Sequence, residues 1–395
     1  MNRREFLQRC TGLGTTVIGA AILAACGGGT TAPASATSTS PSLAAPSAAA
    51  KPPAVSASAA PAGGSAPAAS SAASPPAKPG LKKITYGNIH GLGDASAFIA
   101  LDQGFFAEQG IDLQLVDFAT AVDMIPVLGN GQLDTGNGIT SAGLWNAVGR
   151  GVPIKIPMGT GASDVATHAT VSTFMVRKAL VDSGRVKSPA DIKGLNVMTP
   201  PPGNGVELLF SLIFKKYGLT KSDVVGVPLA ITEVAPALIN GKLDVAATTE
   251  PSTTIISSQG AGSVLLHDYD IYPNYQAGAL YFSPNMVKSD LAIPYMRAFL
   301  KGARTYNDAF FKKLPDARAI AVKALIAHTP LKDASLYDKM SFQHVDPSGG
   351  INVQCLQDMQ DFFVAAGEQQ KAVDLNSVID LSFVKAAAAK LPPYS

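Results

Sequence analysis

The residues best suited to chemistry stand in five short polar loops, each after an apolar segment that we expect to be a strand. Their hydroxyl, amide, carboxyl and imidazole groups can hydrogen-bond a small molecule. Several of the loops lead into helices, whose N-termini present unpaired N–H groups and a partial positive charge. We therefore expect ligand contacts from His90, Asn137, Thr140, Ser141, Thr160, Ser163, Gly203, Asn204, Gly205, Thr249 and Glu250.

Four of these residues also have a structural interpretation. Ser141 and Asn204 stand where a side chain can cap the following helix as well as touch a ligand. His90 can be an ordinary loop histidine, and Glu250 can either cap a helix or serve as counter-ion to a ligand amine. The five loops contain no arginine, so they offer no bidentate clamp for a sulfonate or carboxylate. The ligand can instead be neutral, aromatic or amine-bearing.

Motifs of common enzyme classes are missing from the sequence. It contains no Gly-x-Ser-x-Gly, His-Glu-x-x-His, Cys-x-x-Cys or phosphate-loop pattern. The histidines show no spacing typical of metal ligands; they are His90, His168, His267, His328 and His344. We expect a binding protein without catalytic residues, metal or cofactor.

The elements that must position these loops alternate between short strands and amphipathic helices, which is typical of parallel sheets covered by helices. The sequence predicts strands at 84–87, 111–118, 133–136 and 154–158, and a second series after 171–176 with strands at 196–198, 224–227, 243–247 and 264–266. It predicts helices at 96–109, 122–128, 141–148, 207–217 and 233–240, and helices alone from Leu291 onward.

An internal repeat indicates two similar lobes. Residues 128–134 (LGNGQLD) match residues 238–244 (LINGKLD) in five of seven positions. In both copies a helix would end on Asn-Gly, which favours the left-handed conformation, and Leu-Asp would open a strand. Ligands of open α/β sheets lie beyond the carboxyl ends of the strands, so two facing lobes would enclose a ligand between them.

The N-terminal residues read as an export signal followed by a tether. Arg3 and Arg4 precede a short apolar stretch that ends in Leu-Ala-Ala-Cys26, as in a cleaved lipoprotein signal over 1–26. The arginine pair favours twin-arginine export, with an ordinary Sec signal as the alternative. Residues 27–80 are almost entirely Ala, Ser, Pro, Gly and Thr, which predicts a disordered tether. We expect an exported protein on the periplasmic or cell-surface side, lipid-anchored at Cys26.

Charge, cysteine count and hydrophobicity limit the kinds of protein that this chain can be. The net charge of +2 gives no electrostatic motive for nucleic-acid binding. With Cys10 in the signal and Cys26 acylated, Cys355 has no disulfide partner and is expected to be a packed, inert thiol. Beyond the N-terminus no apolar run approaches the ~20 residues that cross a bilayer.

Several segments of the body together resemble one known family, the solute-binding proteins of ABC importers for nitrate, sulfonates, taurine and related compounds. The segments that carry the resemblance are 100–112 (ALDQGFFAEQGID), 131–134 (GQLD), 149–155 (GRGVPIK), 191–194 (DIKG), 217–219 (YGL), 241–244 (GKLD) and 250–251 (EP). Each is weak alone, but their order and spacing are specific.

The resemblance implies the type II periplasmic-binding-protein fold, an α/β fold of two Rossmann-like lobes joined by two chain crossings. We place the crossings near 170–177 and 276–282, lobe 1 at 82–172 plus 280–395, and lobe 2 at 176–274. It also implies a monomer that delivers a small molecule to an ABC permease and its ATPase.

Two alternatives remain. One is a sensor that reports to a membrane kinase. The other is an enzyme like the thiamine-precursor synthases, whose cysteine-rich motif has no counterpart here.

Overall fold

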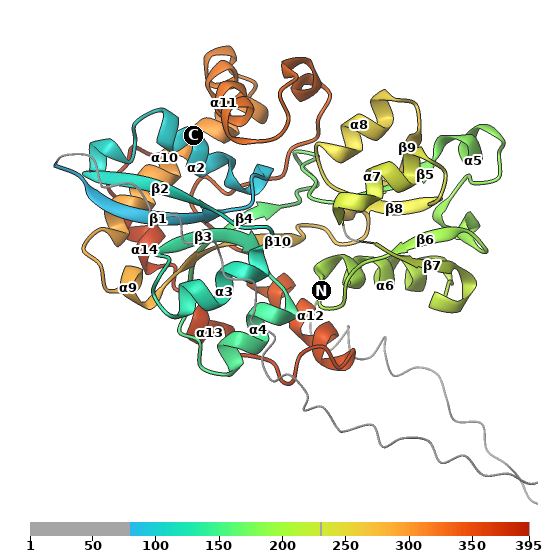
Figure 1. The fold of residues 1–395 in the computed structure, drawn as a ribbon, viewed down its shortest axis with the longest axis horizontal. Coiled ribbons are helices and arrows are strands. Elements are labelled where there is room, and N and C mark those ends of the chain that lie inside the picture. The colour runs from blue at the N-terminus through green and yellow to red at the C-terminus, as the bar shows by residue number, and fades with distance from the viewer. Residues whose placement is uncertain (1–79, 230, 395) are drawn as a thin grey trace, which may run out of the picture. The chain divides into compact units, whose positions relative to one another are not determined.

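The computed structural model describes residues 80–229 and 231–394, which fold into two five-stranded sheets with flanking helices (Figure 1). The first sheet has the order β2-β1-β3-β10-β4, formed by β1 (Lys82–Asn88), β2 (Ile111–Asp117), β3 (Thr135–Ile139), β4 (Lys155–Ala162) and β10 (Gln276–Phe282). The second has the order β7-β6-β8-β5-β9, formed by β5 (Thr173–Arg177), β6 (Asn196–Thr199), β7 (Val225–Pro228), β8 (Val245–Thr248) and β9 (Gly262–His267). We call the parts built on these sheets the first and second lobes.

Helices follow the strands along the chain, as the pattern predicts. Those between strands are α2 (Ala95–Asp102), α3 (Ala121–Gly129), α4 (Ala142–Gly149), α5 (Lys178–Asp182), α6 (Gly205–Tyr217), α7 (Ile231–Ile239) and α8 (Ser252–Ser258). The chain after β10 contains α9 (Pro284–Val287), α10 (Ala292–Phe310), α11 (Pro315–His328), α12 (Val353–Ala365), α13 (Leu375–Val378) and α14 (Ser382–Ala388). None of the helices in the described residues is both long enough and apolar enough to span a bilayer.

Each sheet contains one strand that runs against its neighbours. In the first lobe β10 is antiparallel to β3 and β4, and in the second lobe β5 is antiparallel to β8 and β9. Both strands come directly after a connection between the sheets, over 163–172 and 268–275. The crossings predicted at 170–177 and 276–282 therefore lie several residues too late. Most of each predicted segment belongs to a strand, β5 or β10, and the connection precedes that strand.

The carboxylate of Asp268 joins the two connections, beside backbone hydrogen bonds such as that from the Ser163 N–H to the Tyr275 carbonyl at 2.8 Å. Asp268 accepts hydrogen bonds from the Thr170 hydroxyl at 2.7 Å and from the N–H groups of Val171 at 3.0 Å and Ser172 at 2.8 Å. Its side chain is fully buried, and this burial raises the pKa of the Asp268 carboxyl. The connections are therefore fastened together by buried polar contacts.

The internal repeat is one structural unit used twice. Gly131 and Gly241 both have positive φ, 75° and 71°, and end their helices as predicted. The aspartates that follow also act alike: Asp134 accepts from the Thr85 N–H, and Asp244 from the Asn196 N–H. Each aspartate ties the start of one strand to its neighbour.

The predicted helix over 96–109 is shorter in the structure. Helix α2 ends at Asp102, since Gly104 adopts a left-handed conformation with φ of 72°, and only a 3₁₀ turn follows at Ala107–Gln109. The apolar residues of that stretch still enter the core; Phe98 and Phe106, for example, are buried.

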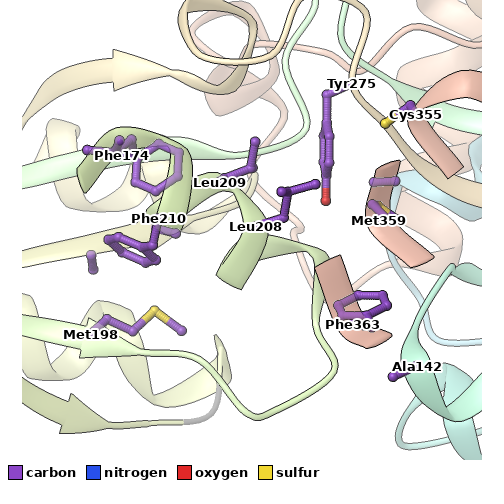
Figure 2. Close-up of a cluster of buried hydrophobic side chains, with 14 of the residues drawn as sticks. Ala142, Phe174, Met198, Leu208, Leu209, Phe210, Tyr275, Cys355, Met359 and Phe363 are labelled. Carbon is purple, nitrogen blue, oxygen red and sulfur yellow. The ribbon is translucent and has the colours of Figure 1, made fainter. Parts of the chain in front are cut away.

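Helix α12 packs against both lobes. Figure 2 shows Met359 and Phe363 of α12 within one buried apolar cluster. Beside them lie Leu208 of α6, Ala142 of α4, and Tyr275, which directly precedes β10. The predicted signal peptide, the lipidation at Cys26 and the tether up to residue 79 lie outside the described residues.

Candidate functional site

The predicted loops lie at the carboxyl ends of strands in both lobes, but two of them begin later than predicted. Asn137 lies within β3 and Thr160 within β4, because both strands extend beyond the predicted ends at 136 and 158. In the first lobe they follow β1, β3 and β4, which run in the same direction, and in the second lobe they follow the parallel pair β6 and β8. Loops at the same end of parallel strands meet at one edge of the sheet. The topology therefore collects the candidate residues at one edge of each sheet.

Two of these loops, from opposite lobes, touch each other. Ser141 and Asn204 form an isolated antiparallel bridge, and the Ala142 N–H donates to the Gly203 carbonyl at 3.0 Å. A Cβ on Gly203 would stand 2.9 Å from the Ala142 Cβ, and one on Gly205 would stand 2.2 Å from the Tyr275 hydroxyl oxygen. Only glycine permits this close approach, so Ser141, Gly203, Asn204 and Gly205 form one group at the boundary of the lobes.

Ser141 and Asn204 also act as helix caps. The Ser141 hydroxyl accepts from the Leu144 N–H at 3.3 Å, and Asn204 Oδ1 accepts from the Val206 N–H at 2.9 Å. Both residues therefore cap helices, as the structural interpretation predicts. Capping uses only an acceptor oxygen of each side chain, so the Asn204 amide N–H groups and the Ser141 O–H can still donate to a ligand.

A second group lies on the first sheet and is almost fully buried. Thr160 Oγ1 donates to Asn137 Oδ1 at 2.5 Å, and Gln276 Nε2 donates to the Thr160 carbonyl at 2.6 Å. Thr160 reaches Asn137 across β10 because Gly278 has no side chain; a Cβ there would stand 2.7 Å from Thr160 Oγ1. Thr140 is also buried, and its hydroxyl donates to the Ala277 carbonyl at 3.2 Å.

Asp94, which is not among the predicted site residues, organises the first loop. It accepts from the Tyr86 hydroxyl at 2.7 Å and from the N–H groups of Ile89 and Gly91 at 3.1 and 3.3 Å, and Asn137 also hydrogen-bonds it. Burial raises the pKa of Asp94 to about 6 although these hydrogen bonds oppose the shift. The signal in the sequence was an aspartate at the end of a polar loop, just before an apolar helix.

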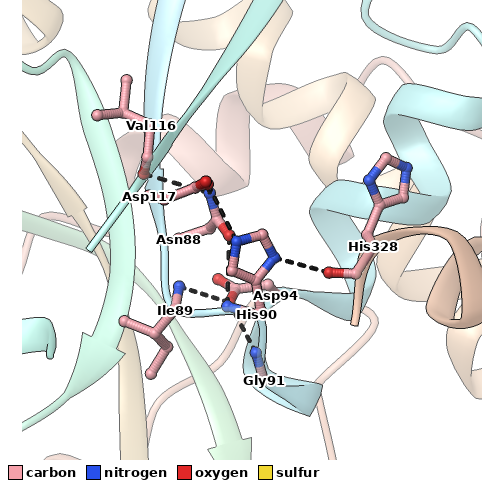
Figure 3. Close-up of polar contacts among 8 residues, drawn as sticks. All are labelled: Asn88, Ile89, His90, Gly91, Asp94, Val116, Asp117 and His328. Carbon is pink, nitrogen blue, oxygen red and sulfur yellow. Dashed lines mark hydrogen bonds and ion pairs between the residues drawn. The ribbon is translucent and has the colours of Figure 1, made fainter. Parts of the chain in front are cut away.

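His90 is held by the protein at both ring nitrogens (Figure 3). Its Nδ1 lies 2.7 Å from the His328 carbonyl oxygen, and its Nε2 lies 3.0 Å from an Asp117 carboxylate oxygen. The backbone has φ of 56°, a left-handed conformation uncommon for a residue other than glycine. These contacts agree with the structural interpretation of His90.

Two open pockets contain further candidates. One, of about 500 Å³, lies beside the end of β4 and includes Thr160, Ser163 and Gln276. The other, of about 310 Å³, lies beside α8 and includes Glu250. Glu250 accepts from the N–H groups of Thr254 and Ser341, both at 3.1 Å, and burial raises the pKa of its carboxyl.

The candidates therefore fall into several groups rather than one pocket. Thr249, beside Glu250, is half-buried, and its carbonyl accepts from the Thr253 N–H at 3.2 Å. No cluster of three or more His, Cys, Asp or Glu residues in the described part of the chain is placed to hold a metal ion.

Proteins similar to this chain are binding proteins for the most part. A Brucella abortus protein described as a binding protein is 23% identical over 287 residues, which are 71% of this chain and 85% of the relative. The nitrate-binding protein NrtA from Synechocystis PCC 6803 superposes with a TM-score of 0.62 at 12% identity, covering 79% of this chain and 89% of its own. The aliphatic sulphonate binding protein SsuA from Escherichia coli gives 0.59 at 17% identity, covering 77% and 92%.

The fold is not restricted to binding proteins. The desulfurization enzyme DSZB superposes with a TM-score of 0.56 at 14% identity, covering 78% of this chain and 99% of the enzyme. At these identities the likeness shows the fold, which is the type II periplasmic-binding-protein fold predicted from the sequence. The family follows from a sequence model described as NMT1/THI5 like, which matches residues 94–308, more than half of the chain. The chain belongs to the NMT1/THI5-like family.

Proposed function

We propose that the chain is an extracytoplasmic solute-binding lipoprotein that captures a small molecule between its lobes and delivers it to an ABC importer. The observation that carries the proposal is the contact between the loops after β3 and β6, where Ser141 and Ala142 meet Gly203 and Asn204. A solute between these loops would touch both lobes. Closure then acts as a population shift, because a ligand that contacts both lobes binds the closed form more tightly.

The solute that fits best is neutral, aromatic or amine-bearing rather than a sulfonate or nitrate. The five candidate loops contain no arginine. Strong anion sites use bidentate arginine donors, which these loops lack. We therefore do not propose nitrate or a sulfonate, the ligands for which NrtA and SsuA are named, as the solute of this chain.

We propose no enzymatic activity for the chain, although the DSZB likeness raises the question. A nucleophilic cysteine needs an accessible thiolate. Cys355, the one cysteine among the described residues, is fully buried, and burial raises the pKa of its thiol to about 12. It is therefore unsuited to attack a substrate.

Thermal unfolding tests solute binding without knowledge of the ligand. The chain is partly unfolded in guanidinium, washed free of small molecules and refolded, and its unfolding temperature is measured with and without a low-molecular-mass extract of the host. A solute at 100 times its dissociation constant stabilises the folded state by about 2.7 kcal/mol. The proposal predicts a rise in unfolding temperature with one fraction of the extract; no rise with any fraction contradicts it.

Import and sensing are separated by the partner protein. After crosslinking in host membranes, we expect a permease and an ATPase to co-purify with the chain. Recovery of a membrane kinase alone would contradict delivery to an importer.

A further inference from the structure

Two glutamate carboxyl groups meet at the boundary of the lobes, on the same backbone N–H. The Gly203 N–H lies 2.9 Å from Glu207 Oε2 and 2.9 Å from Glu368 Oε2. Glu207 belongs to the first turn of α6 in the second lobe, and the two carboxyl groups are within hydrogen-bonding reach of each other. One N–H is thus shared by two acceptors.

Glu368 is attached to the first lobe. It follows α12, and its carbonyl accepts from the Asn146 side chain on α4 at 2.8 Å. The same asparagine accepts from the Gln370 N–H at 3.1 Å, so the segment is held to α4 at two points. The carboxyl pair therefore joins a group fixed on the first lobe to α6 of the second lobe.

Two carboxylates that share a site cannot both be ionised without strong repulsion, whereas one shared proton turns the repulsion into a hydrogen bond. We propose that Glu207 and Glu368 form a proton-dependent latch that favours contact between the α4 and α6 ends of the lobes in acidic medium and releases it as the pH rises. This deepens the proposed function, since it regulates access to the same boundary between lobes.

The surroundings of the pair support this inference. The pKa of Glu207 is raised by burial first and by the Glu368 carboxyl second; the hydrogen bond from the Gly203 N–H opposes the shift, and the Lys221 ammonium opposes it less strongly. Helix α4 carries no titratable side chain. On α12, Asp358 accepts from the Tyr272 hydroxyl and Asp361 from the Gln357 side chain, and the buried Cys355 has its thiol pKa raised to about 12. The Tyr275 hydroxyl, near Gly205, is buried with a raised pKa.

The sign of the pH effect follows from linkage. The pKa of Glu207 is raised from 4.5 while the lobes are in contact, so the contact binds the proton more tightly than the separated lobes do. The stabilisation is fully present below pH 4.5 and is lost as the pH rises through the raised value.

Amide hydrogen exchange of the ligand-stripped chain tests the latch directly. The reporters are the Ala142 and Gly203 amides, read in peptides from α4 and the loop before α6, at about pH 5 and about pH 8 and corrected for intrinsic exchange. In the parent chain we expect the opening equilibrium at both amides to rise at least about fivefold at the higher pH, the lower end of usual coupling between sites.

Variants separate the latch from general pH effects. Glu207→Gln keeps an oxygen for the Gly203 N–H and supplies its own N–H donors to Glu368, so the contact should stay protected at both pH values. Glu108→Gln, at an exposed carboxylate paired with Lys301, should behave like the parent. If Glu207→Gln does not fold, Glu368→Gln carries the same expectation.

Either of two results overturns the proposal: equal protection of the parent at both pH values, or the same pH dependence in parent and Glu207→Gln. Because the experiment contains no solute, its failure leaves solute binding untouched, and failure of the extract experiment leaves the latch untouched.

Discussion

At the scale of single residues, most candidate side chains make hydrogen bonds within the protein. Asn137 and Thr160 bond each other, His90 bonds Asp117 and the His328 carbonyl, and Asn204 caps α6. Buried polar groups need such partners because an unpaired one costs about 1–3 kcal/mol. A ligand must therefore use the remaining donors and acceptors of these groups or exchange one partner for another.

Replacement of Asn204 by alanine separates its capping role from any ligand contact. The change removes the acceptor of the Val206 N–H, and loss of such a cap costs about 1 kcal/mol of unfolding free energy. Asn204→Asp keeps the acceptor and should keep most of the stability.

Urea unfolding of the ligand-stripped chain measures this loss, and the extract-induced rise in unfolding temperature measures binding. We expect Asn204→Ala to lose both. An Asn204→Ala chain that loses stability yet keeps the full rise would show a cap with no ligand contact.

The raised pKa of the Asp94 carboxyl should make the free energy of unfolding depend on pH. Its pKa is raised from 3.8 to about 6 in the folded chain, so its contribution to stability is fully present below pH 3.8 and lost as the pH rises through 6. Two pKa units correspond to about 3 kcal/mol. Relative to Asp94→Asn, which cannot titrate, the unfolding free energy of the parent should fall by up to about that amount over this interval. A constant difference between the two proteins across these pH values would contradict the shift.

The sequence could predict where the polar residues stand but not which partners they take. The loops after strands were visible as polar residues between apolar runs, whereas the bond from Thr160 to Asn137 depends on the β3-β10-β4 order and on Gly278 between them. Likewise, Glu368 reaches Gly203 from a segment that Asn146 holds to α4. Contacts between residues so distant in sequence leave no local pattern.

At the scale of elements, the internal repeat and the alternation of strands and helices were enough to predict both sheets. The second lobe contains strands at the positions that the sequence predicts, and the repeat ends its helices on Gly131 and Gly241. The predicted crossing at 276–282 is instead strand β10, because an apolar segment near a hinge has the same composition as a buried strand. Local composition does not reveal which sheet such a segment joins.

The hydrogen bonds that Asp268 accepts from the first connection lead us to expect a large loss of stability when Asp268 is replaced. Asp268→Ala leaves the N–H groups of Val171 and Ser172 without their acceptor and should cost about 3–5 kcal/mol. The Thr170 hydroxyl loses its shorter hydrogen bond and keeps only the Ser172 carbonyl at 3.1 Å. Thr170→Val removes one donor while keeping the shape, and should cost about 1 kcal/mol. Urea unfolding of the two variants measures the difference. Equal, small losses would show that the aspartate does not fasten the two connections.

At the scale of the whole molecule, the family and the fold agree with the predictions, while the N-terminal part stays a prediction. Cys26 lies outside the described residues, so the anchor must be tested by its chemistry. Cys26→Ser removes the thiol to be acylated and should shift the chain from the detergent phase to the aqueous phase in Triton X-114 partition. Cys355→Ser, at a buried thiol, is the matched control. Unchanged partition of Cys26→Ser would contradict lipidation.

The central claim is that the boundary between the lobes holds a small solute. Native mass spectrometry of the chain isolated from its own host tests it most directly, because it weighs what co-purifies. We expect a mass excess of one small molecule that collisional activation removes; the excess should be retained in Glu108→Gln and reduced in Asn204→Ala. A parent chain with only the mass of the lipidated polypeptide, or an equal excess in Asn204→Ala, Ser141→Ala and the parent, would contradict it.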